Sequence, residues 1–170
     1  MVSKLKMNTK TQTDFKIPEP PRGIKAILWR LPIWLYRLKL GWLVGQRMLL
    51  LTHIGRKSGE PRRAVLEVIH YDPETKTPYV ASGFGEKSQW YRNISQNKDV
   101  TIQLGSQRFE ATAVRLSTED AEKIFQVYHQ KHPNAIKNLS KMIGYEVGED
   151  EESLTQFMRS IPVVAFQPQG

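Results

Sequence analysis

A short cationic loop bounded by two glycines follows the apolar run at residues 48–54. Its sequence, GRKSG at residues 55–59, presents Arg56, Lys57 and Ser58 in succession. The planar guanidinium of arginine and the ammonium of lysine both bind phosphate or carboxylate oxygens, and the serine hydroxyl adds one more donor. The glycine spacing differs from that of the phosphate loop of nucleotide hydrolases. These residues therefore indicate either a solvated hairpin tip or a binding site for an anion.

A second glycine-rich loop, ASGFGEKSQW at residues 81–90, follows one predicted strand and precedes a predicted helix. Small residues let a planar ligand approach the backbone closely, and the start of a helix supplies free N–H groups. The alternative is a plain connection between strand and helix. If the two loops come from neighbouring strands, a ligand with a flat ring and an anionic tail would span both.

The remaining candidates for chemistry are weak. His129 and His132 lie three positions apart without a third ligand nearby, so no metal site is predicted. His53 and His70 each fall on a strand and are interpreted as structural. Glu67 is isolated on a strand and could face a ligand or solvent. Cysteine is absent and no Gly-x-Ser-x-Gly motif occurs, which excludes thiol catalysis and disulfides and disfavours a hydrolase.

The elements that must position these loops follow from the hydrophobic pattern. Alternating and β-branched residues predict strands, whereas Ser117 followed by acidic residues predicts the start of a helix. The predicted strands are 47–54, 62–71, 78–82, 99–105, 107–116 and 161–168, and the predicted helices are 89–97, 117–131, 133–144 and 150–160. This order lacks regular βαβ alternation. It favours an α+β domain around an antiparallel sheet, closed into a barrel, over a Rossmann fold.

Length and charge limit the classes of partner. A chain of 170 residues forms one domain of ordinary size, and a net charge of +8 favours anionic partners. The basic residues concentrate before residue 64, and acidic residues gather at 146–152. No nucleic-acid recognition motif is present, so binding to nucleic acid is not predicted. The absence of cysteine suits a reducing cytoplasm.

The first 46 residues differ from the rest of the chain. Residues 1–21 are polar, end in PEPPRG and are predicted to be a disordered lead without a secretory signal. Residues 22–46 are predicted to form one or two basic amphipathic helices, and residues 47–170 the main domain. The helical segment 23–46 is too charged to span a membrane. It either packs on the domain or lies in a headgroup layer, on the inner face of the membrane.

Taken together, three motifs resemble the deazaflavin-dependent nitroreductase family. They are LLLTHIGRKSGEPRRAVLEV, then YVASGFGEKSQWYRNISQNKDVTIQLGSQRFEATA, and the closing IPVVAF, which together span roughly residues 45–168. The resemblance implies a split β-barrel related to the flavin-binding pyridoxamine-phosphate oxidases. It also implies hydride transfer by coenzyme F-420, an 8-hydroxy-5-deazaflavin whose tail carries a phosphodiester and carboxylates.

The resemblance also assigns roles to individual residues. Arg56, Lys57 and Ser58 would hold the anionic tail, and Ala81, Ser82 and Gly83 would lie against the deazaflavin ring. Other predicted cofactor contacts are Arg62, Arg63, Ala64, Val65, Leu66, Gln89, Trp90, Tyr91 and Asn93. Ser82 and Tyr145 are the predicted catalytic residues, as donors of a hydrogen bond or a proton to the substrate.

Two departures bear on the substrate, which would be a quinone, an enone or a nitro compound. Family members that reduce nitroimidazoles tend to carry an aromatic residue where Glu67 stands and a lysine where Gly83 stands. Two other functions stay open: an FMN-binding or haem-binding barrel of the same fold, and a non-catalytic lipid carrier on membranes. The expected oligomeric state is a monomer or a homodimer.

Overall fold

The computed structural model describes residues 47–142 and 150–170. The predicted disordered lead at 1–21, the predicted helical segment at 22–46 and the predicted catalytic Tyr145 therefore lie outside the described residues. Within the described part, the order of elements is three strands, a helix, two strands, three helices and a final strand. This is the order that the hydrophobic pattern predicts.

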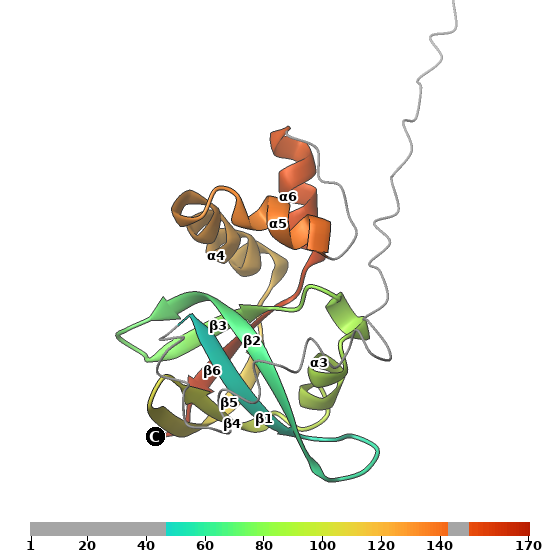
Figure 1. Ribbon diagram of the computed structural model, residues 1–170, viewed down its shortest axis with the longest axis vertical. Helices are drawn as coiled ribbons and strands as arrows, with labels where there is room; N and C mark the ends of the chain where they lie inside the picture. The colour runs from blue at the N-terminus through green and yellow to red at the C-terminus, as the bar shows by residue number, and fades with distance from the viewer. Residues whose placement is uncertain (1–46, 143–149) are drawn as a thin grey trace, which may run out of the picture.

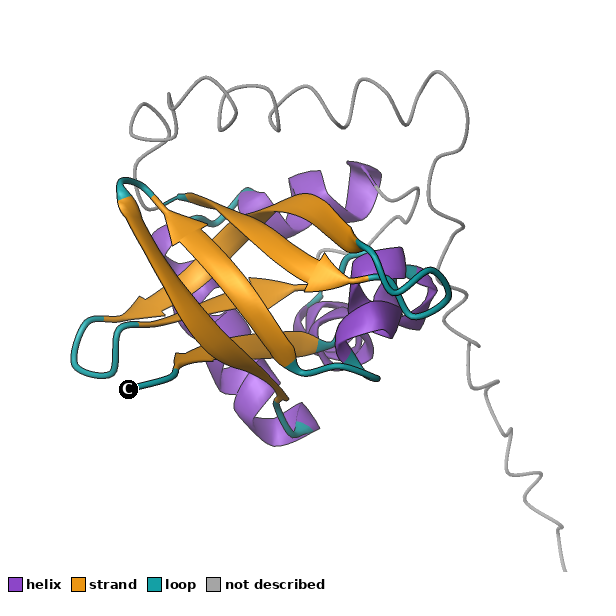
Figure 2. Ribbon diagram, turned by 90° about the horizontal axis from the view of Figure 1, so that it is seen from below, coloured by secondary structure: helices purple, strands orange, loops and turns teal. Residues whose placement is uncertain are grey.

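Six antiparallel strands close into a barrel, as predicted (Figure 1). Around the barrel the strands follow one another in the order β1-β2-β3-β6-β5-β4, and β4 pairs again with β1. The strands are β1 (Met48–Ile54), β2 (Pro61–Asp72), β3 (Thr77–Ala81), β4 (Asp99–Leu104), β5 (Gln107–Arg115) and β6 (Val163–Pro168). Seen from below, the long β1–β2 hairpin runs across the barrel (Figure 2). Its tip is the GRKSG loop.

The helices begin where the sequence provides caps. Ser117 Oγ accepts a hydrogen bond from Asp120 N at 3.1 Å, and Asp150 Oδ1 accepts one from Ser153 N at 2.8 Å. Each cap satisfies a backbone donor that the first helical turn leaves free. The helices are η2 (Gly85–Lys87, a 3₁₀ turn), α3 (Gln89–Ile94), α4 (Thr118–Lys131), α5 (Ala135–Met142) and α6 (Glu151–Ser160).

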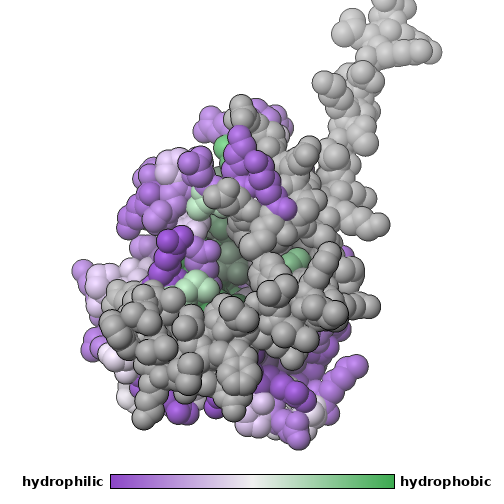
Figure 3. All heavy atoms as spheres, in the orientation of Figure 1, coloured by the Kyte–Doolittle hydropathy of each residue, from purple (hydrophilic) through white to green (hydrophobic). Residues whose placement is uncertain are grey.

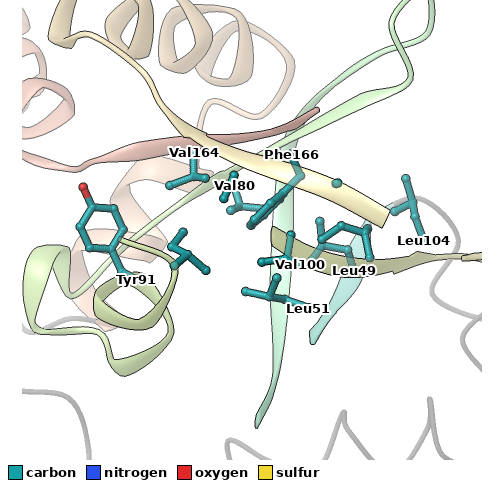
Figure 4. Close-up of a cluster of buried hydrophobic side chains, with 12 residues drawn as sticks. Leu49, Leu51, Val80, Tyr91, Val100, Leu104, Val164 and Phe166 are labelled. Atoms are coloured by element: carbon teal, nitrogen blue, oxygen red, sulfur yellow. The ribbon is translucent and has the colours of Figure 1, made fainter. Parts of the chain in front are cut away.

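One hydrophobic core fills the barrel, because alternate residues of every strand point inward. Phe166 lies at its centre among Val80, Val100 and Leu49, and none of these side chains is more than 3% exposed. Figure 4 shows Tyr91 entering the same cluster from α3, at one end of the barrel. Helix α3 is thereby fixed against the barrel, beside the strands that lead to the GRKSG loop.

A second hydrophobic core lies between the outside of the barrel and helices α4, α5 and α6. Ile69 and Val163 contribute from the outer faces of β2 and β6, and Phe125 and Phe157 contribute from α4 and α6. Figure 1 shows these three helices together on one side of the barrel, with α3 set apart from them. Figure 3 shows hydrophilic residues over the outer faces of the helices and hydrophobic residues in the recess between them and the barrel.

Candidate functional site

The GRKSG loop is a tight turn that depends on both of its glycines. Gly55 N donates to Glu60 O and Gly59 N donates to Gly55 O, each at 2.8 Å. Gly59 has a φ of 69°, in the left-handed region that favours glycine. A Cβ at Gly55 would lie 2.8 Å from Ser58 Oγ and 3.3 Å from Glu60 O. The turn therefore folds back on itself at both ends and presents Arg56, Lys57 and Ser58 on its outer side.

Arg56 joins this turn to helix α3. Its Nη1 donates to Gln89 Oε1 at 3.0 Å and to Asn93 Oδ1 at 2.9 Å. Its backbone N also donates to Asn93 Oδ1, at 3.2 Å. The structure thus brings together the cationic loop and the helix that follows the second glycine loop, from positions up to 37 residues apart in the chain.

Behind Arg56, a buried amide and a buried imidazole complete the network. Asn93 Nδ2 lies 3.2 Å from His53 Nδ1, and the two side chains are 6% and 4% exposed. Because Asn93 Oδ1 accepts from two N–H groups of Arg56, its amide orientation is fixed and Nδ2 points at His53. Nδ2 can only donate, so His53 Nδ1 must accept and its proton sits on Nε2. Burial is the main factor that lowers the pKa of His53 from its ordinary value, and the nearby Arg62 charge lowers it further.

The cationic loop retains donors for an anion. Nη1 of Arg56 is fully used, whereas no hydrogen bond within residues 47–142 and 150–170 engages its Nε or Nη2. Lys57 is exposed beside it. Arg62 Nη2 lies 3.3 Å from Glu60 Oε2 and 3.4 Å from Ser58 Oγ, on the exposed face of the hairpin. A held guanidinium fork, an exposed ammonium and a hydroxyl fit a phosphodiester or carboxylate tail.

The second glycine loop is held by Ser82, which is fully buried. Its Oγ donates to Gly85 O at 2.7 Å and lies 2.9 Å from Ser88 Oγ, while its backbone N donates to Pro162 O at 2.8 Å. The predicted ring-binding residues Ala81 and Gly83, on either side of it, are half-buried. The hydroxyl of Ser82 thus shapes the loop from within.

The other predicted cofactor contacts divide between the core and the surface. Tyr91 is 4% exposed inside the barrel cluster, and Leu66 and Trp90 pack against that cluster. A contact of Tyr91 with a cofactor would therefore run through its backbone atoms. Along β2, Arg63 is exposed, and Ala64 and Val65 are half-buried.

Glu67 faces helix α4 on the outside of the barrel. Tyr128 Oη donates to Glu67 Oε1 at 3.1 Å, and Arg47 Nη2 lies 3.7 Å from the same oxygen. Burial, followed by the Glu67 charge, raises the pKa of Tyr128 to about 12. Val68 pairs with Val80 across β2 and β3, which puts Glu67 close to Ala81 at the start of the second glycine loop. An acidic group thus stands near the predicted ring site.

Three features of the site were not predicted from the sequence. They are the role of His53, the central place of Asn93 in the network, and the hydrogen bond of Tyr128. The helical spacing of Ala121, Phe125 and Tyr128 indicates a buried face of α4, and nothing in that pattern marks a phenol hydrogen-bonded to a carboxylate. His53 falls within a strand, and nothing in the neighbouring sequence distinguishes it from a histidine that only packs. Only the contact across 40 residues gives it a role beyond packing.

Barrel and loops together define a class of protein, the split β-barrel. A solved structure described as a domain-swapped dimer superposes with a TM-score of 0.53, at 20% identity, covering 84% of this chain and 99% of that one. Atu2129 of Agrobacterium tumefaciens, a protein of unknown function, also superposes with a TM-score of 0.53, at 14% identity, covering 83% of this chain and 56% of that one. At these identities the likeness establishes the fold alone.

The family follows from the sequence itself. The profile of the F420H(2)-dependent quinone reductase family matches residues 29–144. A Mycobacterium tuberculosis protein, Rv3178, named provisionally as an F420H(2)-dependent quinone reductase, is 35% identical over 91 residues, which cover 52% of this chain and 75% of that protein. This chain belongs to the F420H(2)-dependent quinone reductase family, whose members are oxidoreductases that use coenzyme F-420. No helix among the described residues is both long and apolar enough to cross a membrane.

Proposed function

We propose that coenzyme F-420 lies across the GRKSG loop and the 81–93 segment, with its anionic tail at Arg56 and Lys57 and its ring against residues 81–83. The observation that supports this placement is the pair of hydrogen bonds from Arg56 Nη1 to Gln89 and Asn93. They hold the guanidinium between the two loops, and no hydrogen bond from the described residues engages Nε or Nη2. A rigid anchor of this kind spends less conformational entropy on binding than a free arginine would.

When bound, the reduced coenzyme supplies a hydride, which reduces a quinone by two electrons once one proton is added. The chain's own contribution is orientation. The GRKSG loop holds the tail, and the Ser82-bonded loop fixes the backbone against which the ring would rest. Tyr145, outside the described residues, remains a predicted donor of the proton to the acceptor.

We propose quinones as the preferred acceptors, ahead of nitro compounds and enones. The family whose profile matches this chain is described by quinone reduction, which supports this order. The carboxylate of Glu67, close to Ala81 in the strand register, would repel acceptors that carry negative charge, and it does not distinguish among neutral quinones, nitro compounds and enones. The test monitors oxidation of the reduced coenzyme with a neutral quinone, a nitroaromatic compound and an enone. Turnover only with nitro compounds would contradict the preference.

Titration of the purified protein with coenzyme F-420 tests the cofactor assignment separately. Binding should quench the fluorescence of the oxidised coenzyme. A protein that instead carries FMN or haem, visible in its absorbance, and leaves the F-420 fluorescence unchanged would support the alternative split-barrel function. Co-purified lipid together with no affinity for any of the three cofactors would support the carrier.

Ser82→Ala is expected to act through the shape of the loop. The substitution removes the two buried hydrogen bonds of the Ser82 hydroxyl, with Gly85 O and with Ser88 Oγ, and leaves Gly85 O only the longer one from Ser88 N at 3.3 Å. The loss should lower the free energy of unfolding by about 1–3 kcal/mol and weaken coenzyme binding. Chemical denaturation and fluorescence titration measure the two effects. Ser160→Ala, which removes a similar hydroxyl-to-carbonyl bond on α6, is the matched control and should leave binding unchanged. A large loss of turnover with unaltered binding would instead make Ser82 a proton donor.

We further propose that residues 23–46 contact the membrane surface, where apolar quinones dissolve. This segment carries three of the four tryptophans of the chain, interleaved with lysine and arginine. Anionic vesicles should shift the tryptophan emission to shorter wavelength, and replacing Arg30, Arg37 and Lys39 by glutamate should weaken vesicle binding on the order of 100-fold. Glutamate at Lys123, Lys131 and Lys141, an equal charge change elsewhere, is the control. Equal losses in both variants would refute a specific role for the segment.

The oligomeric state is proposed to be a monomer or a homodimer. One structure of this fold is described as a domain-swapped dimer. Sedimentation velocity over a range of concentrations separates the two states, and a higher oligomer would contradict the proposal.

A further inference from the structure

His53 is a buried imidazole with no assigned role in binding or chemistry. It is 4% exposed and its Nδ1 lies 3.2 Å from Asn93 Nδ2. Asn93 in turn accepts two hydrogen bonds from Arg56, through the backbone N and through Nη1. The three side chains form one continuous line from the interior of the protein to the cationic loop.

We infer that His53 is a positioning residue of the anion-binding loop: its neutral imidazole holds the amide of Asn93 in the orientation that fixes Arg56. This inference rests on the proposed function only for the identity of the anion. The positioning of the loop itself is a property of the protein without cofactor.

The reasoning begins with the Asn93 amide, which can be turned in two ways. With Oδ1 toward Arg56, every contact pairs a donor with an acceptor. With Nδ2 toward Arg56, two N–H groups of Arg56 would face an NH₂ group. An acceptor at His53 Nδ1 selects the first orientation, because it provides a partner for Nδ2. An apolar or protonated residue at position 53 removes the partner of Nδ2 and leaves the orientation to Arg56 alone.

Protonation of His53 would therefore disturb the loop. An N–H at Nδ1 would face the NH₂ of Asn93, and the new positive charge would stand among cations: Arg62 on the paired strand β2, and Arg56 beyond Asn93. From α3, the group that faces His53 is the neutral Asn93 amide. Among the described residues, the Ile54 backbone, beside His53 on β1, favours the charged form.

The sign of the pH dependence follows. The pKa of His53 is lowered in the folded protein relative to its ordinary value of 6.5. Above pH 6.5 the imidazole is neutral in both the folded and the unfolded chain, and the network is intact. As the pH falls below 6.5, the unfolded chain binds the proton first, so stability declines until His53 is protonated in the folded protein as well. The loop itself is expected to loosen only at the lower end of this range, where His53 takes up the proton in the folded protein.

The first test uses the protein without cofactor. Hydrogen exchange of the Arg56 amide, which donates to Asn93 Oδ1, reports directly on the network. In His53→Leu its protection factor should fall about tenfold, as expected for the loss of one buried hydrogen bond. His53→Asn places an amide oxygen near the position of Nδ1 and should retain the protection. It should also abolish the loss of protection that we expect of the natural protein at the pH where His53 becomes protonated in the folded state.

His70→Asn is the matched control. His70 lies on β2, is half-buried and also has a lowered pKa, mainly because of burial. Its ring lies against that of Tyr79 at an interplanar angle of 51°, and it does not join the network among the described residues. Its replacement should leave the pH dependence of Arg56 protection unchanged. Unchanged protection in His53→Leu, or a pH dependence that persists in His53→Asn, would overturn the inference whether or not coenzyme F-420 binds.

The second test measures the affinity for coenzyme F-420 at pH 7 and at pH 5. His53→Leu should bind about tenfold more weakly at pH 7, and His53→Asn within about threefold of the natural protein at both pH values. Natural protein that binds the coenzyme with equal affinity above and below the pH at which NMR shows His53 to be protonated in the folded state would contradict the inference and leave the proposed function intact. Natural protein that shows the expected amide protection without binding the coenzyme would contradict only the proposed function.

Discussion

Replacing Arg56 and Lys57 together by alanine is expected to weaken the binding of coenzyme F-420 on the order of a thousandfold. Hydrogen bonds to charged groups are worth about 1.5–3 kcal/mol each, and both side chains stand on a turn that projects them outward. Two such contacts amount to a factor of roughly 10²–10⁴ in the dissociation constant. Fluorescence titration of the coenzyme at a fixed, moderate salt concentration measures the change.

The single variants separate charge from positioning. Lys57→Ala removes an exposed ammonium and should weaken binding on the order of tenfold or more without a change in stability. Arg56→Ala also removes the two side-chain hydrogen bonds to α3 and should lower the free energy of unfolding as well. Lys98→Ala combined with Arg108→Ala takes the same charge from exposed positions elsewhere and is the control. If this control loses as much affinity as the loop variant, the attraction is general and the tail site is misplaced.

Asn93→Leu is expected to have the largest effect on the protein itself. The substitution leaves the Arg56 backbone N–H, an Arg56 guanidinium N–H and the acceptor His53 Nδ1 without their partner. Unsatisfied buried groups cost about 1–3 kcal/mol each, but Arg56 is only half-buried and water can serve its guanidinium. We therefore expect a loss of about 2–4 kcal/mol in the free energy of unfolding and a loss of coenzyme affinity on the order of 100-fold.

Two comparisons make the Asn93 result interpretable. Arg92→Ala changes an exposed neighbour on the same helix and should affect neither quantity by more than a small factor. Asn93→Asp keeps an acceptor for Arg56 but loses the donor to His53, so it should recover part of the affinity. Asn93→Leu protein that melts normally and binds the coenzyme normally would show that the bridge between the loops is dispensable.

The fold could be predicted largely from local patterns. The β5 alternation, the Gly105-Ser106 turn and the Ser117 cap are each written in a few adjacent residues, and the structure has each of them where the pattern predicts it. Barrel closure was the less certain step, since the pairing of β4 with β1 joins residues some fifty positions apart. The absence of βαβ alternation was enough to favour an antiparallel sheet.

The sequence predicts the region of the site but not the contacts that support it. Two glycine loops, one of them cationic, mark the region because glycine and arginine have recognisable conformational and chemical roles. The supporting contacts are different. His53 to Asn93 and Glu67 to Tyr128 span 40 and 61 residues, and neither member of each pair is unusual for its own element. Only the three-dimensional structure distinguishes a histidine that orients an amide from one that merely packs.

The most direct measurement of the central claim compares two ligands: intact coenzyme F-420, and the same deazaflavin without its phosphodiester and glutamyl tail. Each is titrated against the natural protein and against the Arg56→Ala, Lys57→Ala double variant, which forms a thermodynamic cycle. The account predicts that the natural protein prefers the intact coenzyme by on the order of 10²-fold or more, and that the double variant loses most of this preference. Equal preference in both proteins would contradict the claim that the GRKSG loop binds the anionic tail.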